Sequence, residues 1–159
     1  QRLGGEYAMT PYAMTYLEAS LTELESVTSR RSMLWERYQK AFKKSMPQVL
    51  EEADSHGIIL PSKITHARGN AHIYYLIMPD TQSREGLRLY LKERNIDAYT
   101  HYEPLHLSEG GKRYGKTRKS LSNTEAIAQR MLRLPLYDAL SIEEQDRVIE
   151  AVINYVIRS

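Results

Sequence analysis

Hydrophobic residues recur at three- and four-residue steps through the first part of the chain. Thr10 followed by Pro11 is typical of a helix start, because threonine caps free N–H groups and proline is tolerated in the first turn. The apolar positions that follow are Leu17, Leu21, Leu24, Val27, Leu34, Tyr38 and Ala41. This spacing predicts one helix over residues 11–46, which is long for a chain of 159 residues and is expected to reach another domain or subunit.

Shorter apolar segments farther along the chain predict β-strands. Residues 58–61 and 72–78 are rich in β-branched and aromatic side chains and stop at prolines, and residues 96–102 alternate between apolar and polar. The segment 131–136 contains Pro135, which favours a short strand at the edge of a sheet. We therefore expect three or four strands, with 72–78 in a central position.

Polar residues at helix starts predict three more helices. Ser83 is expected to cap a helix that ends near Asn95, a residue suited to the left-handed conformation. Ser122 and Ser141 are each followed three residues later by glutamate, the arrangement of a capping box. The last of these helices is expected to run nearly to the C-terminus.

The order of these elements predicts an α/β (α+β) fold. A long N-terminal helix precedes a three- to four-stranded sheet, which helices cover mainly on one face. We therefore divide the chain into a connecting helix over residues 11–46 and a small α/β domain over residues 47–159.

Composition limits the chemistry that is available. Hydrophobic residues make up 42% of the chain, and the net charge of +2 produces no field that would predict nucleic acid or a membrane as partner. The absence of cysteine excludes disulfides and thiolate sites. No segment has the layout of a secretion signal or a membrane span, so a cytoplasmic location is expected. Twelve tyrosines suit either a partly hydrated interface or a tyrosine-rich core wall.

The densest cluster of candidate functional side chains is His101, Tyr102, Glu103 and His106. It lies at the end of a predicted strand and at the start of a predicted long loop over residues 107–121, where binding residues tend to lie. A metal site on the two histidines and Glu103 is one interpretation, although the spacing differs from the helical His-Glu-x-x-His arrangement. Contact with a substrate and simple exposure to solvent are the others.

The predicted loop 107–121 is basic and glycine-rich, with Lys112 and Arg113 at its centre. Arginine pairs bidentately with phosphate and glycine lets the backbone approach, so this composition suits phosphate binding. No P-loop or dinucleotide fingerprint accompanies it, which leaves a solvated mobile loop as the alternative. His72 is expected to be a hydrogen-bonded core residue, and no pair of carboxylates stands out for acid–base catalysis.

Taken together, several segments resemble the sugar-nucleotide aminotransferases of the DegT/DnrJ/EryC/StrS type, which use pyridoxal 5'-phosphate. The segments are 4–10 (GGEYAMT) leading to 34–38 (LWERY), 70–75 (NAHIYY), 100–106 (THYEPLH) and 132–136 (LRLPL). Their order and separation carry the resemblance, which covers nearly the whole chain. It implies the small C-terminal domain of a fold-type I pyridoxal-phosphate enzyme, with residues 1–10 as the tail of the large cofactor domain.

The resemblance also implies an activity and a set of contacts. The expected reaction moves an amino group, from an amino acid such as glutamate, to a dTDP-4-keto-6-deoxy sugar for lipopolysaccharide or enterobacterial common antigen. The catalytic lysine belongs to the large N-terminal domain of such enzymes, so no residue of this chain is assigned a catalytic role. Tyr7 is expected to approach the cofactor phosphate of the partner subunit in a homodimer. The implied substrate-binding residues are His101, Tyr102, His106, Lys112 and Arg113. The alternative function is a non-enzymatic module that binds a nucleotide sugar or a protein.

Overall fold

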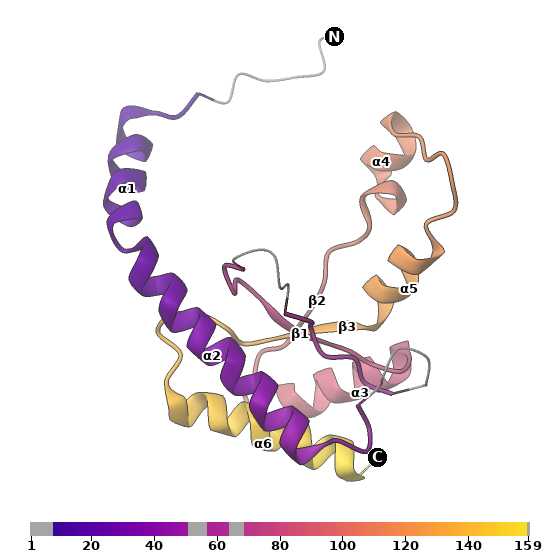
Figure 1. The fold of residues 1–159 in the computed structure, drawn as a ribbon. Coiled ribbons are helices and arrows are strands. Elements are labelled where there is room, and N and C mark those ends of the chain that lie inside the picture. The colour runs from indigo at the N-terminus through magenta and orange to yellow at the C-terminus, as the bar shows by residue number, and fades with distance from the viewer. Residues whose placement is uncertain (1–7, 51–56, 64–68, 159) are drawn as a thin grey trace.

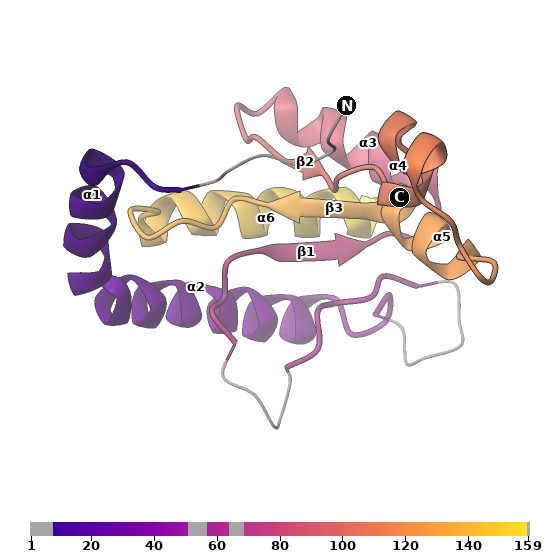
Figure 2. The same ribbon diagram turned by 90° about the horizontal axis from the view of Figure 1, so that it is seen from above.

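The computed structural model describes residues 8–50, 57–63 and 69–158. Its centre is a three-stranded antiparallel sheet of β1 (Tyr74–Ile77), β2 (Tyr99–Thr100) and β3 (Met131–Leu134). One face of the sheet is covered by α2 (Leu24–Ser45), α3 (Thr81–Lys92) and α6 (Ile142–Arg158) (Figures 1 and 2). Beyond the opposite face extend α1 (Pro11–Thr22) on one side, and η1 (Leu105–Leu107), α4 (Glu109–Tyr114) and α5 (Ser122–Arg130) on the other (Figure 1). This arrangement confirms the predicted fold class.

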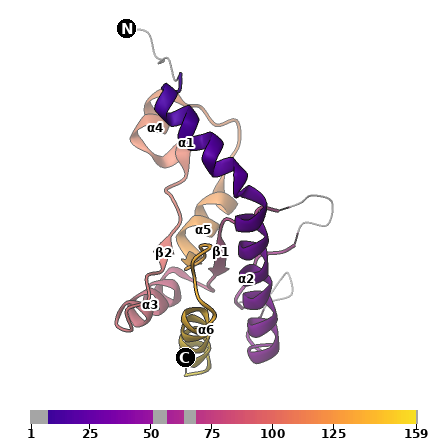
Figure 3. The ribbon, with the colours of Figure 1, turned by 90° about the vertical axis from the view of Figure 1, so that its left-hand side faces the viewer.

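The helix predicted over residues 11–46 is in fact two helices. At Glu23 the backbone departs from helical values (φ −93°, ψ 0°), and α2 runs in a different direction from α1 (Figure 3). Helix α1 has no buried residue, whereas α2 buries Tyr38 and three further side chains. The core therefore anchors only α2, and α1 projects from it with Tyr12 and Tyr16 exposed.

Strand β3 is the central strand, which corrects both the edge position predicted for residues 131–136 and the central position predicted for residues 72–78. The strand order is β1-β3-β2, and both pairs are antiparallel. Pro135 follows Leu134, the last residue of β3, so its missing N–H interrupts no ladder hydrogen bond. The proline marks the end of the strand and not the edge of the sheet.

The remaining strands are shorter than predicted. Strand β1 covers only the later part of 72–78, and β2 covers two residues of 96–102. The segment 58–61 forms isolated bridges, in which Ile59 and Ile77 exchange two backbone hydrogen bonds of 3.0 Å. This contact holds the segment beside β1 without building a fourth strand.

Capping interactions decide where the helices begin and end. Asp80, and not Ser83, is the N-cap of α3: its carboxylate accepts the Ser83 N–H at 2.7 Å, and this hydrogen bond lowers the pKa of Asp80. Asn95 adopts the predicted left-handed conformation (φ 56°). Ser141 and Glu144 form the predicted reciprocal capping box, with hydrogen bonds of 2.9 and 3.0 Å.

The region before α5 differs from its prediction. Ser122 forms no capping box, because α5 already includes it and Leu121 is the N-cap; the Glu125 side chain contacts His106. The predicted loop 107–121 contains helix α4, which Ser108 caps. Within the described residues, no helix is long and apolar enough to cross a lipid bilayer.

The hydrophobic core lies between the sheet and its covering helices. Tyr74, Leu132 and Tyr38 belong to this cluster and have no exposed surface. Burial raises the pKa of both tyrosines above the usual value. The Tyr38 hydroxyl donates to the carbonyl of Pro135 at 2.9 Å, whereas the Tyr74 hydroxyl has no hydrogen-bond partner among the described residues. Part of the tyrosine excess thus forms a core wall.

Candidate functional site

The face of the sheet opposite the three helices carries a row of polar and aromatic side chains. Tyr75, Arg133 and Tyr99 are paired across the three strands, so their side chains share this face. Ile77 and Met131 form the next row. We call these five residues the open face. Helix α1 and the α4–α5 segment extend beyond it on opposite sides (Figure 1).

Two of the predicted substrate-binding residues lie beside the open face. His101 and Tyr102 follow β2 directly, and their ring centroids are 5.5 Å apart. The guanidinium carbon of Arg133 lies 5.3 Å from the centroid of the Tyr102 ring. Nδ1 of His101 and Nε of Arg133 are buried and have no hydrogen-bond partner among the described residues. One exposed tyrosine ring therefore contacts two side chains that each carry an unsatisfied nitrogen.

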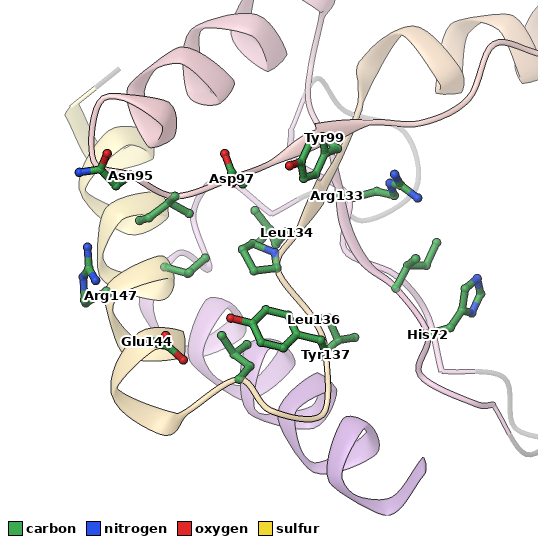
Figure 4. A pocket seen from close by; sticks show the side chains of 15 residues that line it. His72, Asn95, Asp97, Tyr99, Arg133, Leu134, Leu136, Tyr137, Glu144 and Arg147 are labelled. Carbon is green, nitrogen blue, oxygen red and sulfur yellow. The ribbon is translucent and has the colours of Figure 1, made fainter. Parts of the chain in front are cut away.

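A pocket of about 500 Å³ opens beside this cluster (Figure 4). Arg133 and His72 lie at one end of it, and Glu144 and Arg147 of α6 lie at the other (Figure 4). Leu134 and other apolar residues line the space between them. Charged groups at the two ends of an apolar surface suit a ligand that has both polar and apolar parts.

His72 is not the core residue that its position predicted. Its side chain is exposed, and Nδ1 lies 2.9 Å from Oδ1 of Asn70, which also accepts the His72 backbone N–H at 3.3 Å. Ala71 has a positive φ of 47°. This turn delays the start of β1 to Tyr74, so the His72 side chain stays outside the core and reaches the pocket.

His106 lies in a second pocket, of about 590 Å³, which η1, α4 and the following loop form. Its Nε2 lies 3.0 Å from Oε1 of Glu125 on α5, a contact that ties η1 to α5. A Cβ at Gly111 would overlap the carbonyl oxygen of Leu105, so α4 folds back on η1 only with glycine at this position. The structure thus places His106 apart from the cluster on the open face.

Lys112 lines this second pocket and is exposed, as is Lys116. Arg113 does not line it: its guanidinium lies 5.1 Å from the ring centroid of its neighbour Tyr114. Of the substrate-binding residues expected from the sequence, His106 and Lys112 therefore line the second pocket. His101 and Tyr102 lie beside the open face, and neither they nor Arg113 line either pocket.

The candidate metal ligands do not converge. In the described part of the chain, no three His, Asp or Glu side chains come close enough together to hold a metal ion. Glu103 is exposed and His106 pairs with Glu125, so the alternative metal site with His101 is not formed. Tyr7, expected near a cofactor phosphate, lies outside the described residues.

Arg133 is the site residue that the sequence analysis missed. It is the only charged residue within 131–136, and its alternation with the buried Leu132 and Leu134 places it on the opposite side of β3. A single arginine inside an apolar strand is the signal that would have identified it.

Comparison with known proteins connects these features to one family. A profile of the DegT/DnrJ/EryC1/StrS aminotransferase family matches residues 1–153. The dTDP-3-amino-3,4,6-trideoxy-alpha-D-glucose transaminase of Micromonospora megalomicea subsp. nigra is 30% identical over 138 residues, which cover 86% of this chain and 34% of the relative. The chain spans about a third of the length of the curated relatives that it matches.

Solved structures show the same fold. Streptomyces venezuelae DesV, in complex with a ketimine intermediate, superposes with a TM-score of 0.76 at 28% identity, over 100% of this chain and 41% of that chain. The sugar aminotransferase Spr1654 of Streptococcus pneumoniae, in its PLP form, has a TM-score of 0.65 at 25% identity, over 88% of this chain and 34% of that chain. Because the family profile matches nearly the whole length of this chain, the chain belongs to the DegT/DnrJ/EryC1/StrS aminotransferase family.

Proposed function

We propose that this chain forms the substrate-side part of an enzyme that transfers an amino group from an amino acid to a nucleotide-linked keto sugar. The observation that carries the proposal is the cluster of His101, Tyr102 and Arg133, in which an exposed ring adjoins two unsatisfied nitrogen atoms. Aromatic faces together with a few placed polar groups are typical of small-molecule sites. Membership of the aminotransferase family supports the reaction class.

The substrate that we propose is a dTDP-4-keto-6-deoxy sugar, with glutamate as amino donor and surface polysaccharides as the destination of the product. Its support is the resemblance in segments 100–106 and 132–136, together with a relative that is itself a dTDP-amino-sugar transaminase. In the fold these two segments meet, because β2 pairs with β3. A cytoplasmic location is part of the same proposal.

We assign the diphosphate of this substrate to the second pocket. Lys112 lines it and forms no ion pair with any described carboxylate, so its charge is available to an anionic ligand. The imidazole of His106, oriented by Glu125, is the neighbouring polar group. Arg113 is adjacent in sequence and is a further candidate for the same phosphates.

Pyridoxal phosphate, when bound, supplies the electron sink for amino transfer. Holding it covalently requires a lysine in the site. The pocket beside the open face is lined by Arg133, Arg147 and a histidine but by no lysine, and Lys112 and Lys116 of the second pocket are exposed. These two pockets fit the substrate side of the reaction and not the covalent cofactor site. As the family resemblance implies, we place the Schiff-base lysine in the large domain of the enzyme, outside this chain.

The large domain and a second subunit are the partners that we propose, in a homodimer. Helix α1 buries no residue, and its Tyr12 and Tyr16 are 90% and 78% exposed. Met14 and Leu21 of the same helix are exposed as well. Such a concentration of large exposed hydrophobic residues is typical of a surface that another chain or domain covers.

The test uses the complete enzyme that contains this chain, supplied with pyridoxal phosphate, glutamate and dTDP-4-keto-6-deoxyglucose. We expect formation of the amino sugar, detected by mass spectrometry. Tyr102→Ala is expected to raise KM for the nucleotide sugar about 3- to 10-fold, because it removes an aromatic contact. Lys112→Gln is expected to raise it about 2- to 5-fold. The control is Lys92→Gln, which removes an exposed lysine of α3 outside both pockets and should leave KM unchanged.

Each alternative gives a different result. If the complete enzyme forms no amino sugar, the proposed reaction is wrong. If this chain alone turns over with added pyridoxal phosphate, the lysine has been placed wrongly. Micromolar binding of a dTDP-sugar by this chain in calorimetry, combined with no turnover by the complete protein, would favour the non-enzymatic binding module.

A further inference from the structure

Arg133 is the only charged residue in the three described strands, whose sequences are otherwise apolar or aromatic with one threonine. It lies within the central strand, paired with Tyr75 on one side and Tyr99 on the other. The ring of Tyr102 is a third aromatic neighbour, 5.3 Å from the guanidinium carbon. A permanent positive charge therefore lies among three tyrosines on the open face.

No described side chain balances this charge. Arg133 has no ion pair or hydrogen bond with a described residue, and its Nε is buried. Arg37 and Arg130 also carry a buried nitrogen without a partner, but another nitrogen of each is bonded: Arg37 donates to Asp146 at 2.6 Å, and Arg130 donates to the Pro79 carbonyl at 3.2 Å. Arg31 of α2 has a buried, unpartnered Nε as Arg133 does, but Arg133 is the one that lies in the sheet and lines the pocket beside the open face. Asp97 lines the same pocket as Arg133 but is not paired with it. A buried donor without an acceptor costs free energy, which an oxygen atom of a bound ligand would recover.

We propose that Arg133 binds an oxyanion, a carboxylate or a phosphate, of a ligand that occupies the pocket beside the open face. The guanidinium presents parallel N–H donors whose spacing matches the two oxygens of such a group. The neighbouring tyrosine rings restrict the side chain, so less freedom is lost when the ligand binds. His72 and Tyr99 are the polar groups nearest to it along the pocket wall (Figure 4).

Which substrate supplies the oxyanion depends on the proposed function, whereas the binding of an oxyanion by Arg133 does not. An amino-acid donor carries a carboxylate. A nucleotide sugar carries phosphates, which would reach Arg133 only if the diphosphate does not occupy the second pocket, to which the proposed function assigns it. A carboxylate and a phosphate each present two oxygen atoms that a guanidinium can bind with two parallel hydrogen bonds. The experiment therefore needs one arm that measures binding and another that separates the two sources.

The binding arm is an NMR titration of this 159-residue chain with inorganic phosphate and, separately, with L-glutamate. The Nε–H resonance of Arg133 is expected to shift and saturate with at least one of them. Arg133→Gln should weaken that binding about 10-fold or more, and Arg133→Lys should have an intermediate effect because it keeps the charge but loses the fork. Arg158→Gln is the matched control: it removes the same charge from an exposed position at the end of α6, outside the pocket.

Four results would overturn the proposal. The first is that neither probe shifts the Arg133 resonance, and the second is that Arg133→Gln binds as well as the wild type. The third is that Arg158→Gln weakens binding as much as Arg133→Gln does, since only general electrostatic attraction would then be at work. The fourth comes from Arg133→Lys. If the amide spectrum shows that Arg133→Gln is unfolded, Arg133→Lys decides the question, and an unchanged affinity of that variant overturns the proposal.

The second arm measures steady-state kinetics of the complete enzyme. If Arg133 binds the donor carboxylate, Arg133→Gln raises KM for glutamate about 10-fold and leaves KM for the nucleotide sugar unchanged, whereas a phosphate ligand gives the reverse. If both KM values are unchanged while amino transfer proceeds, the assignment of Arg133 to a substrate is wrong. An enzyme without amino transfer would instead contradict the proposed function, and the oxyanion binding seen by NMR would stand.

Discussion

Two tyrosines in the core determine how the fold should respond to alkaline pH. Tyr38 and Tyr74 have no exposed surface, and their ring centroids are 4.7 Å apart. Burial raises the pKa of each hydroxyl above its usual value, because a phenolate in the core would lack water. In the unfolded chain the same groups ionise near a pH of about 10. Above that pH the unfolded chain binds fewer protons than the folded chain, so the free energy of unfolding falls as pH rises.

The magnitude follows from proton linkage. Each tyrosine that stays protonated only in the folded state lowers the free energy of unfolding by about 1.4 kcal/mol for each pH unit above about 10. Tyr74→Phe removes one of these contributions. At a pH of about 8 the variant should match the wild type to within about 1 kcal/mol, because the Tyr74 hydroxyl has no partner among the described residues. At a pH of about 11 it should have gained about 1.4 kcal/mol relative to the wild type.

Urea unfolding followed by far-UV circular dichroism measures this difference. Tyr12→Phe is the control, because Tyr12 is 90% exposed and its removal changes no buried hydroxyl. Tyr38→Phe should show the same alkaline gain but lose about 1 kcal/mol at neutral pH, since its hydroxyl donates to the Pro135 carbonyl at 2.9 Å. If the stability of Tyr74→Phe follows that of the wild type in parallel from neutral to alkaline pH, the reasoning from burial is refuted.

Three further substitutions probe the packing and the helix ends. Leu132→Ala, at a fully buried position of the central strand, should lower the free energy of unfolding by about 3 kcal/mol in urea titration, and a loss below about 1 kcal/mol would contradict the assigned core. Gln145 has no exposed surface and donates to the Leu34 carbonyl at 2.7 Å, so Gln145→Ala should cost about 2 kcal/mol in the same assay by disconnecting α6 from α2; a neutral substitution would rule out this link. Asp80→Ala removes the N-cap of α3 and should lower the midpoint of thermal unfolding at neutral pH. Because the pKa of Asp80 is lowered in the folded chain, its stabilisation is present above the unfolded pKa and is lost as pH falls through the folded value, so a Tm difference that persists in strong acid would contradict the prediction.

The secondary structure could be predicted where the decisive interactions are local. The left-handed Asn95 and the capping box of Ser141 each depend on residues within one helical turn, and both are present. The prediction failed where a distant residue competes. Helix α5 starts at Ser122 itself, so this serine is not the N-cap, and Glu125 contacts His106, nineteen positions earlier in the chain. The break at Glu23 likewise separates a helix that the core anchors from one that it does not.

The candidate site shows the same division. From the sequence alone, the residue types and their spacing predicted the α/β fold class, and the resemblance to the aminotransferases singled out His101 and Tyr102 as candidate binding residues. Only the tertiary structure decided that β3 lies between β1 and β2, which brings Arg133 beside Tyr102 and leaves its guanidinium without a described acceptor. The physical reason is that strand order depends on pairing between segments tens of residues apart, and a periodicity within one segment carries no information about its neighbours in space.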